Sequence, residues 1–144
     1  MKRIAVLLTC YNRAETTLRC LRLLHEQHST ADLSVYLVDD ASPDETGARV
    51  KSEFPNVNVI QGTGGLYWSR GMALAWRSAK SDFDAYLWLN DDVYLNKDSL
   101  QGLIEDAEKT KWQGAIIGSF VDGAGVMTYG VLEKWKWIYP LGYP

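Results

Sequence analysis

Five short apolar runs alternate with amphipathic segments in this chain, and this alternation limits the available folds more than any other feature. The runs cover residues 4–8, 33–38, 57–60, 87–89 and 115–120. Between them, apolar residues recur at spacings of three and four, which is typical of helices with one buried face. Strands that alternate with helices of this length predict an α/β fold, with a parallel sheet, right-handed crossovers and helices on its faces.

The individual elements can be placed more closely. The run at 87–89 predicts a central strand buried on both faces. A short helix is expected from a cap at Ser42 or Asp44 to Phe54, with Pro43 in its first turn. A turn at 122–125 precedes a hairpin arm at 126–132. The buried helical faces are expected to comprise Ala14, Thr17, Leu18, Leu21 and Leu24, then Trp68, Met72, Ala75, Trp76 and Ala79, then Leu100, Leu103, Ile104 and Ala107.

Length and charge exclude several classes of protein. The 144 residues suit one domain with its own core, and a net charge of −3 provides no broad positive field for nucleic acid. No apolar window is long enough for a transmembrane segment, and the start does not have the form of a signal peptide. We therefore expect a cytoplasmic protein.

The aromatic segment 134–144 fits a surface arm, a peripheral contact at the inner face of the membrane, or the start of a truncated part. We favour the last of these interpretations.

The cysteines and histidines do not predict a metal site. Cys10 and Cys20 are expected on a strand and a helix, without further ligands at zinc spacing, and we interpret them as buried reduced thiols. His25 and His28 lie where the first helix should end and have no acidic or cysteine companion. They are interpreted as solvated residues at a helix end.

Polar residues follow the run at 87–89 directly, as Asn90, Asp91 and Asp92. The carboxyl ends of strands form the crevice in which open α/β sheets bind ligands. Adjacent carboxylates repel each other unless a cation or solvent screens them. A divalent metal, Mg²⁺ or Mn²⁺, that carries a phosphate-bearing substrate is the natural partner. The alternative is a solvated acidic turn that caps a helix beginning near Asn96.

Other polar segments should reach the same edge: residues 9–13, the pair Asp39 and Asp40, the glycine loop 61–65, and Arg70. Tyr11 could stack on a base, and Asp40 could accept a hydrogen bond from a ring N–H. Each also has a structural alternative: Tyr11 in the core, Asp39 and Asp40 as helix caps, and Arg70 in an ion pair. The glycine loop lacks the spacing of a phosphate-binding P-loop.

Three motifs taken together make a specific resemblance. Residues 4–13 (IAVLLTCYNR), 36–46 (YLVDDASPDET) and 87–93 (LWLNDDV) resemble glycosyltransferase family 2, which has the GT-A fold, a Rossmann-like, mostly parallel sheet flanked by helices. The resemblance implies that the following residues bind a nucleotide-diphosphate sugar: Thr9, Tyr11, Asn12, Asp39, Asp40, Gly65, Arg70, Asn90 and Asp91. It implies base contact by Asp40 with support from Asp39, and metal binding by Asp92.

The chain departs from the family pattern at three points. The first position of the Asp-x-Asp motif is the neutral Asn90. The Ala-Arg-Asn segment is Ser69-Arg70-Gly71, within a stretch closer to rhamnosyl-type transferases that build surface polysaccharides. Members are also usually longer, so we expect residues 1–144 to form a single, C-terminally truncated nucleotide-diphospho-sugar-binding domain, with the catalytic base beyond Pro144.

The function implied by the resemblance is metal-assisted, inverting transfer of a sugar to a hydroxyl of a glycan or lipid-linked acceptor. Self-association as a homo-oligomer stays open. The first alternative is a non-catalytic nucleotide-sugar-binding module. A phospho-acceptor signalling domain would need a lysine at a later strand end, which the run at 115–120 does not offer. A P-loop nucleotidase would need a glycine-lysine cradle, which is absent from the sequence.

Overall fold

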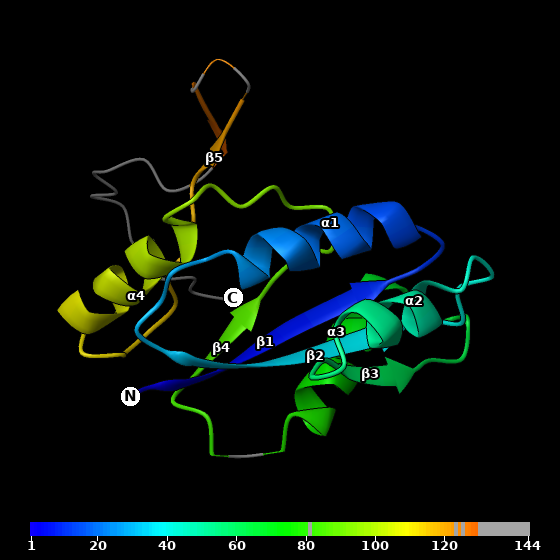
Figure 1. The fold of residues 1–144 in the computed structure, drawn as a ribbon. Helices are drawn as coiled ribbons and strands as arrows, with labels where there is room; N and C mark the ends of the chain where they lie inside the picture. The colour runs from blue at the N-terminus through cyan, green and yellow to red at the C-terminus, as the bar shows by residue number, and fades with distance from the viewer. Residues whose placement is uncertain (81, 123, 125, 130–144) are drawn as a thin grey trace, which may run out of the picture.

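The computed structural model describes residues 1–80, 82–122, 124 and 126–129, most of which belong to a single layered unit (Figure 1). Its elements, in chain order, are β1 (Arg3–Cys10), α1 (Ala14–His25), β2 (Asp32–Asp39), α2 (Thr46–Glu53), β3 (Asn58–Gln61), α3 (Tyr67–Ser78), β4 (Ala85–Trp88), α4 (Ser99–Lys109), β5 (Phe120–Val121) and β6 (Met127–Tyr129).

Four strands form a parallel sheet in the order β3-β2-β1-β4. Cys10 at the end of β1 is beside Asp39 of β2, which is in turn beside Gln61 of β3. The carboxyl ends of these strands therefore meet at one edge. The prediction of a parallel α/β sheet flanked by helices is confirmed.

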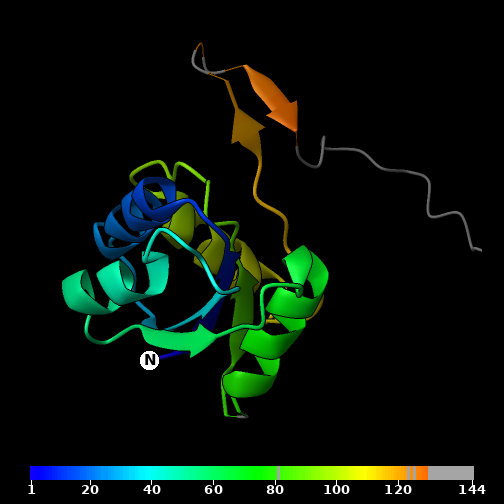
Figure 2. The same cartoon turned by 90° about the vertical axis from the view of Figure 1, so that its right-hand side faces the viewer.

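Alternation along β1 explains how helices cover both faces of this sheet. Val6 and Leu8 pack into a cluster with residues of α1 and α2, whereas Ala5 and Leu7 pack against α3 on the other face. Figure 2 shows α1 and α2 on one side of the sheet and α3 on the other. Helix α4 packs on Ile4, which shares the face of Val6 and Leu8. No helix in the described part of the chain is long and apolar enough to cross a bilayer.

The central position predicted for the strand at 87–89 is wrong. Within the described residues β4 is an edge strand that pairs only with β1, and Trp88 is 45% exposed. Trp68 and Trp76 of α3, predicted to be in the core, are also about half exposed and pack in edge-on contact with Trp88. The other predicted positions, Met72, Ala75 and Ala79, are buried against the sheet, and the bulky indoles lie beside this interface.

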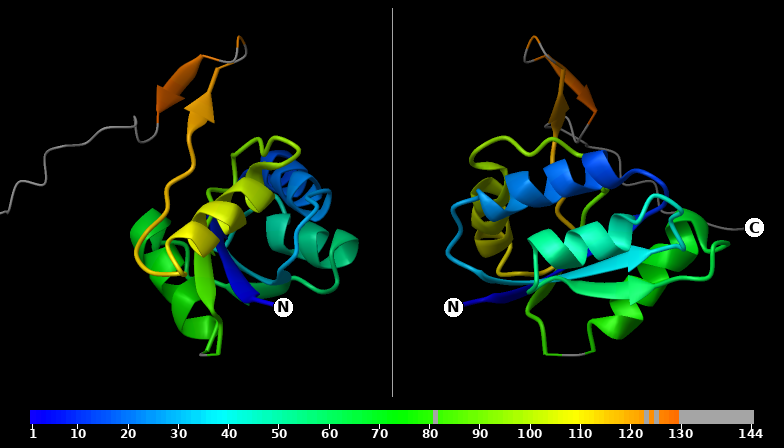
Figure 3. Two further views of the ribbon diagram at one scale, coloured as in Figure 1. Left: turned by 90° about the vertical axis from the view of Figure 1, so that its left-hand side faces the viewer. Right: turned by 45° about the vertical axis from the view of Figure 1, so that its right-hand side comes forward.

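The prediction of a fifth parallel strand at 115–120 is also wrong. Residues 115–119 form no strand, and Ile117 is exposed, because this segment does not reach the edge of the sheet. Phe120 and Val121 instead pair antiparallel with β6, which confirms a hairpin arm after residue 126. Figure 3 shows this hairpin projecting from the layered unit. The rest of the predicted arm, 130–132, and the aromatic segment 134–144 lie outside the described residues.

The structure also tests the predictions for the two cysteines and the two histidines. Cys10 and Cys20 are buried and free, as expected. His25 and His28 are exposed near the end of α1, and His25 also stacks on Phe54 with ring centroids 4.7 Å apart.

Candidate functional site

The first two polar segments are joined by backbone contacts where β1 and β2 end. The N–H of Asp40 donates to the carbonyl of Cys10 at 3.0 Å, and the N–H of Asn12 donates to Oγ of Ser42, also at 3.0 Å. Asn12 has a positive φ of 52°, which turns the chain from β1 towards α1. These contacts hold the loop that carries Tyr11 beside the loop that begins at Asp40.

Asp44 connects the same two loops to their helices. Its carboxylate accepts from the N–H of Ala14 at 2.9 Å, at the start of α1, and from the N–H and hydroxyl of Thr46 at the start of α2. Burial raises the pKa of Asp44, but these hydrogen bonds outweigh burial and the pKa is lowered. The predicted capping of the short helix α2 by Asp44 is confirmed, and the contact of Asp44 with the start of α1 was not predicted. The prediction that Pro43 lies in the first turn of this helix is wrong, because α2 begins at Thr46.

Asp39 ends β2 and Asp40 directly follows it, and their carboxylates bind segments on opposite faces of the sheet. Asp39 accepts from the N–H groups of Ser42 and Gly47, each at 3.0 Å. A side chain at Gly47 would collide with this carboxylate, because its Cβ would lie 2.5 Å from Asp39 Oδ2. The cap predicted as the structural alternative for Asp39 is therefore present at the start of α2.

Asp40 organises the glycine loop before α3. One carboxylate oxygen accepts from the N–H of Gly64 at 2.8 Å, and the other accepts from the N–H groups of Leu66 at 2.8 Å and Tyr67 at 3.3 Å. Burial raises the pKa of Asp40, but these backbone donors more than compensate and the pKa is lowered. Gly64 has a φ of +84°, which other residues rarely adopt. The carboxylate predicted to contact a base is thus also the anchor of the loop.

The two carboxylates after β4 have different environments. Asp91 is buried and accepts from the hydroxyl of Thr17 at 3.1 Å. Burial raises its pKa, although Arg13 and Thr17 act in the opposite direction. The side chain of Asp92 is 53% exposed. A single nitrogen of Arg13, Nη1, lies 3.4 Å from Asp91 Oδ1 and 3.1 Å from Asp92 Oδ2, so the guanidinium bridges the pair.

Helix α3 contacts this edge at two points. The indole N–H of Trp68 donates to Oδ1 of Asn90 at 2.9 Å. Gly71 is packed against the side chain of Thr9 so closely that a Cβ atom would overlap Thr9 Oγ1. Through these contacts the β1, β2 and β4 exits, the glycine loop and α3 form one continuous edge.

The remaining predicted residues lie at this edge with exposed or half-buried side chains. Tyr11 is 54% exposed, so the alternative that placed it in the core is wrong. Arg70 is exposed in the first turn of α3 and forms no ion pair with the residues that the structure describes. A side chain at Gly65 would meet no atom within 4 Å, so its backbone does not require glycine. The binding roles of Tyr11, Arg70 and Gly65 remain predictions.

Sequence reasoning missed the roles of Arg13 and Thr17. The sequence indicates Arg13 only as the end of the 9–13 segment, and Thr17 only as part of a buried helical face. A detectable signal was present, since Arg13 is a cation in a segment predicted to meet an edge rich in carboxylates. The contact between Thr17 and Asp91 depends on the relative placement of α1 and β4, which periodicity does not determine.

The donor set at this edge fits a metal that is held mainly by a ligand's phosphate oxygens. Among the described residues, no three His, Cys, Asp or Glu side chains cluster in a way that could hold a metal by themselves. Asp91 is already engaged by Thr17 and Arg13, whereas the exposed Asp92 can offer an oxygen. Mg²⁺ typically takes one or two carboxylates and completes its shell with phosphate oxygens and water.

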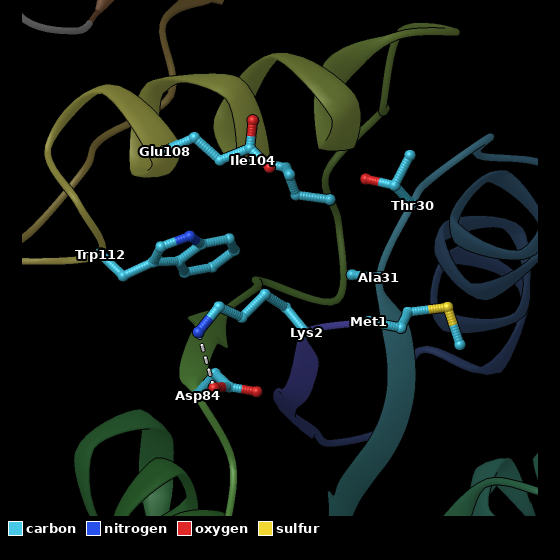
Figure 4. Close-up of a pocket in the computed structure, with 8 residues that line it drawn as sticks. All are labelled: Met1, Lys2, Thr30, Ala31, Asp84, Ile104, Glu108 and Trp112. Carbon is cyan, nitrogen blue, oxygen red and sulfur yellow. Dashed lines mark hydrogen bonds and ion pairs between the residues drawn. The ribbon is translucent and has the colours of Figure 1, made fainter.

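A separate cavity of about 410 Å³ lies at the opposite, amino-terminal edge of the sheet (Figure 4). Lys2 forms an ion pair with Asp84 at 2.9 Å there and also lies over the ring of Trp112. Ile104 and Glu108 of α4 form another wall. None of the predicted site residues lines this cavity, so it is distinct from the candidate site.

The fold and this edge together define a class of protein, an α/β domain with polar side chains gathered at the carboxyl ends of its parallel strands, where open α/β sheets bind ligands. Residues 5–143 match the model of glycosyl transferase family 2, and the chain belongs to that family. A search of curated proteins finds no match to the chain.

Solved structures of similar fold include S. aureus TarS residues 1–349 in complex with UDP, with 26% identity and a TM-score of 0.62. The match covers 76% of this chain and 32% of that one. A mannosyltransferase from Pyrobaculum calidifontis, PcManGT, in complex with GDP-Man and Mn²⁺ has 22% identity and a TM-score of 0.63, over 73% of this chain and 32% of its own. The chain thus matches about a third of the length of either structure, and both support the GT-A-like fold.

Proposed function

We propose that this chain binds the donor of a glycosyl transfer reaction, a nucleotide-diphosphate sugar, at the edge formed by the exits of β1, β2 and β4. One observation carries the proposal: in a member of glycosyl transferase family 2, separate segments bring Tyr11, Asp40, Arg13 and the Asp91–Asp92 pair to a single edge. The described α/β unit is the donor-binding domain, and a metal, Mg²⁺ or Mn²⁺, accompanies the donor at Asp92. The UDP bound to TarS and the GDP-Man and Mn²⁺ bound to PcManGT support this choice of ligands.

The edge has a suitable group for each part of such a donor. Tyr11, more than half exposed, is available to stack on the base. The glycine loop, held by Asp40, presents backbone to the nucleoside, together with Thr9 and Asn12. Arg13 and Arg70 are the cations available to the diphosphate, and Asn90 and Asp91 border the ribose and phosphates. When bound, the metal would supply Lewis-acid stabilisation of the departing diphosphate.

Membership of the family supports a proposal for the finer reaction. The sugar passes to a hydroxyl of a glycan or lipid-linked acceptor with inversion, in surface polysaccharide synthesis, at the cytoplasmic side of a membrane. In-line displacement needs a carboxylate to deprotonate the acceptor. A hexosyl or rhamnosyl donor suits the segment around Arg70.

A non-catalytic nucleotide-sugar-binding module is the second candidate, and one observation favours it. The carboxylates of Asp39, Asp40, Asp44 and Asp91 all accept hydrogen bonds within the described part of the chain. Asp92 is paired with Arg13. Each of these five carboxylates therefore already accepts a hydrogen bond or forms an ion pair, and none of them is arranged as a general base.

Calorimetric titration with UDP and GDP, with and without Mn²⁺, tests the binding step. We expect metal-dependent binding that Asp92→Ala removes and that Asp98→Ala leaves intact, because Asp98 is exposed and its side chain caps no helix. Equal metal-dependent affinity in the Asp92→Ala variant would refute the assignment of Asp92. Assays of transfer and of sugar-nucleotide hydrolysis then separate the enzyme from the binding module, which would bind the donor and do neither.

A further inference from the structure

The guanidinium of Arg13 occupies the position between the two carboxylates where a cation would be expected. Its Nη1 is within 3.4 Å of Asp91 and within 3.1 Å of Asp92. The pair therefore already has a positive partner. A divalent cation that approaches Asp92 without a nucleotide would be repelled by the positive charge of Arg13, and this repulsion weakens metal binding.

The backbone of Arg13 is fixed, but its charged end is not enclosed. Its carbonyl accepts the N–H of Thr17 at 3.0 Å at the start of α1, so the Cα position is set by the helix. The Arg13 side chain is 47% exposed and the Asp92 side chain is 53% exposed. Their ion pair is therefore exchangeable, because exposed pairs contribute little stability.

Asp91 differs because it is held from a second side. Its side chain is only 8% exposed and accepts from Thr17, so it keeps a partner if Arg13 leaves. Arginine has five N–H donors in a planar fork that matches phosphate oxygens, and its ion pairs at this site use a single nitrogen. A diphosphate could therefore engage the remaining donors and draw the guanidinium away from Asp92.

We propose that Arg13 is an internal counter-cation that keeps divalent metal off Asp92 until a nucleoside diphosphate takes over its guanidinium. Metal and nucleotide then bind cooperatively, and the metal alone binds weakly. The coupling is reciprocal, so metal raises nucleotide affinity by the same factor as nucleotide raises metal affinity. This inference rests on the proposed function for its nucleotide half, whereas exclusion of the metal by Arg13 can be measured without any nucleotide.

The experiment measures free Mn²⁺ by electron paramagnetic resonance in titrations of wild type, Arg13→Gln and Arg19→Gln. Arg19 is a matched control in α1, where it lies over the ring of Tyr94 and forms no ion pair with Asp91 or Asp92. Without nucleotide, we expect Arg13→Gln to bind Mn²⁺ roughly tenfold or more tightly than wild type, from the loss of a unit charge a few ångströms away. Arg19→Gln should match wild type. Equal Mn²⁺ affinity in all three proteins would overturn the proposal.

A second series adds UDP or GDP and includes Arg13→Lys, which keeps the charge but loses the fork. We expect nucleotide to increase Mn²⁺ affinity in wild type, less in Arg13→Lys and least in Arg13→Gln. The same increase in all variants would overturn the coupling. If no protein binds either nucleotide, the proposed function fails, and the nucleotide-free titrations still decide whether Arg13 excludes the metal. Arg13→Lys also keeps the proposal testable if Arg13→Gln does not fold, because nucleotide should raise its Mn²⁺ affinity less than that of wild type, and an equal rise would overturn the coupling.

Discussion

Replacing Asp40 by Asn tests whether this carboxylate holds the glycine loop. Asp40 is 6% exposed, and its two oxygens accept from Gly64 on one side and from Leu66 and Tyr67 on the other. Asparagine has almost the same shape but only one accepting oxygen, so its NH₂ group must face a backbone N–H. The substitution therefore removes acceptors and changes little else.

The cost can be worked out from these contacts. If the Asn oxygen faces Leu66 and Tyr67, the bond from Gly64 is lost, and a hydrogen bond to a charged group contributes about 1.5–3 kcal/mol. The two remaining bonds lose their charge assistance, which costs roughly a further 0.5–1 kcal/mol in total. We expect the free energy of unfolding to fall by about 2–4 kcal/mol. With a urea dependence of about 2 kcal/mol per molar, the unfolding midpoint falls by roughly 1–2 M.

Urea unfolding followed by tryptophan fluorescence measures this change, and Asp32→Asn is the matched control. Asp32 is exposed at the opposite end of β2, and its substitution should change the free energy of unfolding by less than about 0.5 kcal/mol. An Asp40→Asn midpoint equal to that of wild type would refute the argument that Asp40 anchors the loop.

The same pair of proteins gives a pH test. The folded-state pKa of Asp40 lies below its ordinary value of 3.8, so the stabilisation is complete above that ordinary value and is lost as the pH falls through the folded pKa. The difference in unfolding free energy between wild type and Asp40→Asn should be constant from about pH 5 to 8 and narrow below about pH 4. A difference that stays constant down to pH 2 would contradict this reasoning.

Three further predictions follow from other contacts. Tyr11→Ala should weaken UDP binding by roughly tenfold in calorimetry, as expected for loss of one stacking contact, with an unchanged urea midpoint because Tyr11 is half exposed. Gly71→Ala should lower the free energy of unfolding by about 1–3 kcal/mol, because the new Cβ would overlap Thr9, and a wild-type midpoint would contradict this packing. Burial raises the pKa of the Cys20 thiol to about 12 and also raises the pKa of Cys10, so a thiol reagent at pH 8 should label both only after unfolding; rapid labelling of the native protein would argue against their burial.

The layered fold could be predicted because the repeated apolar patterns are local and consistent. The continuous apolar run at 4–8 and the stripe containing Leu18 and Leu21 each identify one element, and the alternation of strands with helices implies parallel strands. The position of β4 in the sheet could not be predicted in this way. Its run Tyr86, Leu87, Trp88 is apolar enough for a central strand, and only the order of strands in space shows that Trp88 lies at an edge.

The candidate site could be predicted at the level of its segments but not of its contacts. Strand ends in a parallel sheet meet at one edge, so the proximity of Tyr11, Asp40 and Asp92 follows from topology. Which groups face each other depends on how helices sit on the sheet. The ion pairs of Arg13 and the hydrogen bond from Thr17 to Asp91 join residues more than seventy positions apart, and no local pattern specifies them.

The opposed orientation of Asp39 and Asp40 makes the length of β2 a constraint on the whole edge. Successive residues of a strand point to opposite faces, so Asp39 reaches the start of α2 while Asp40 reaches the loop before α3. Inserting one residue between the buried part of β2 and this pair would rotate each acid towards the wrong partner. Related proteins should therefore differ more readily in which apolar residues form β2 than in the number of residues that β2 contains.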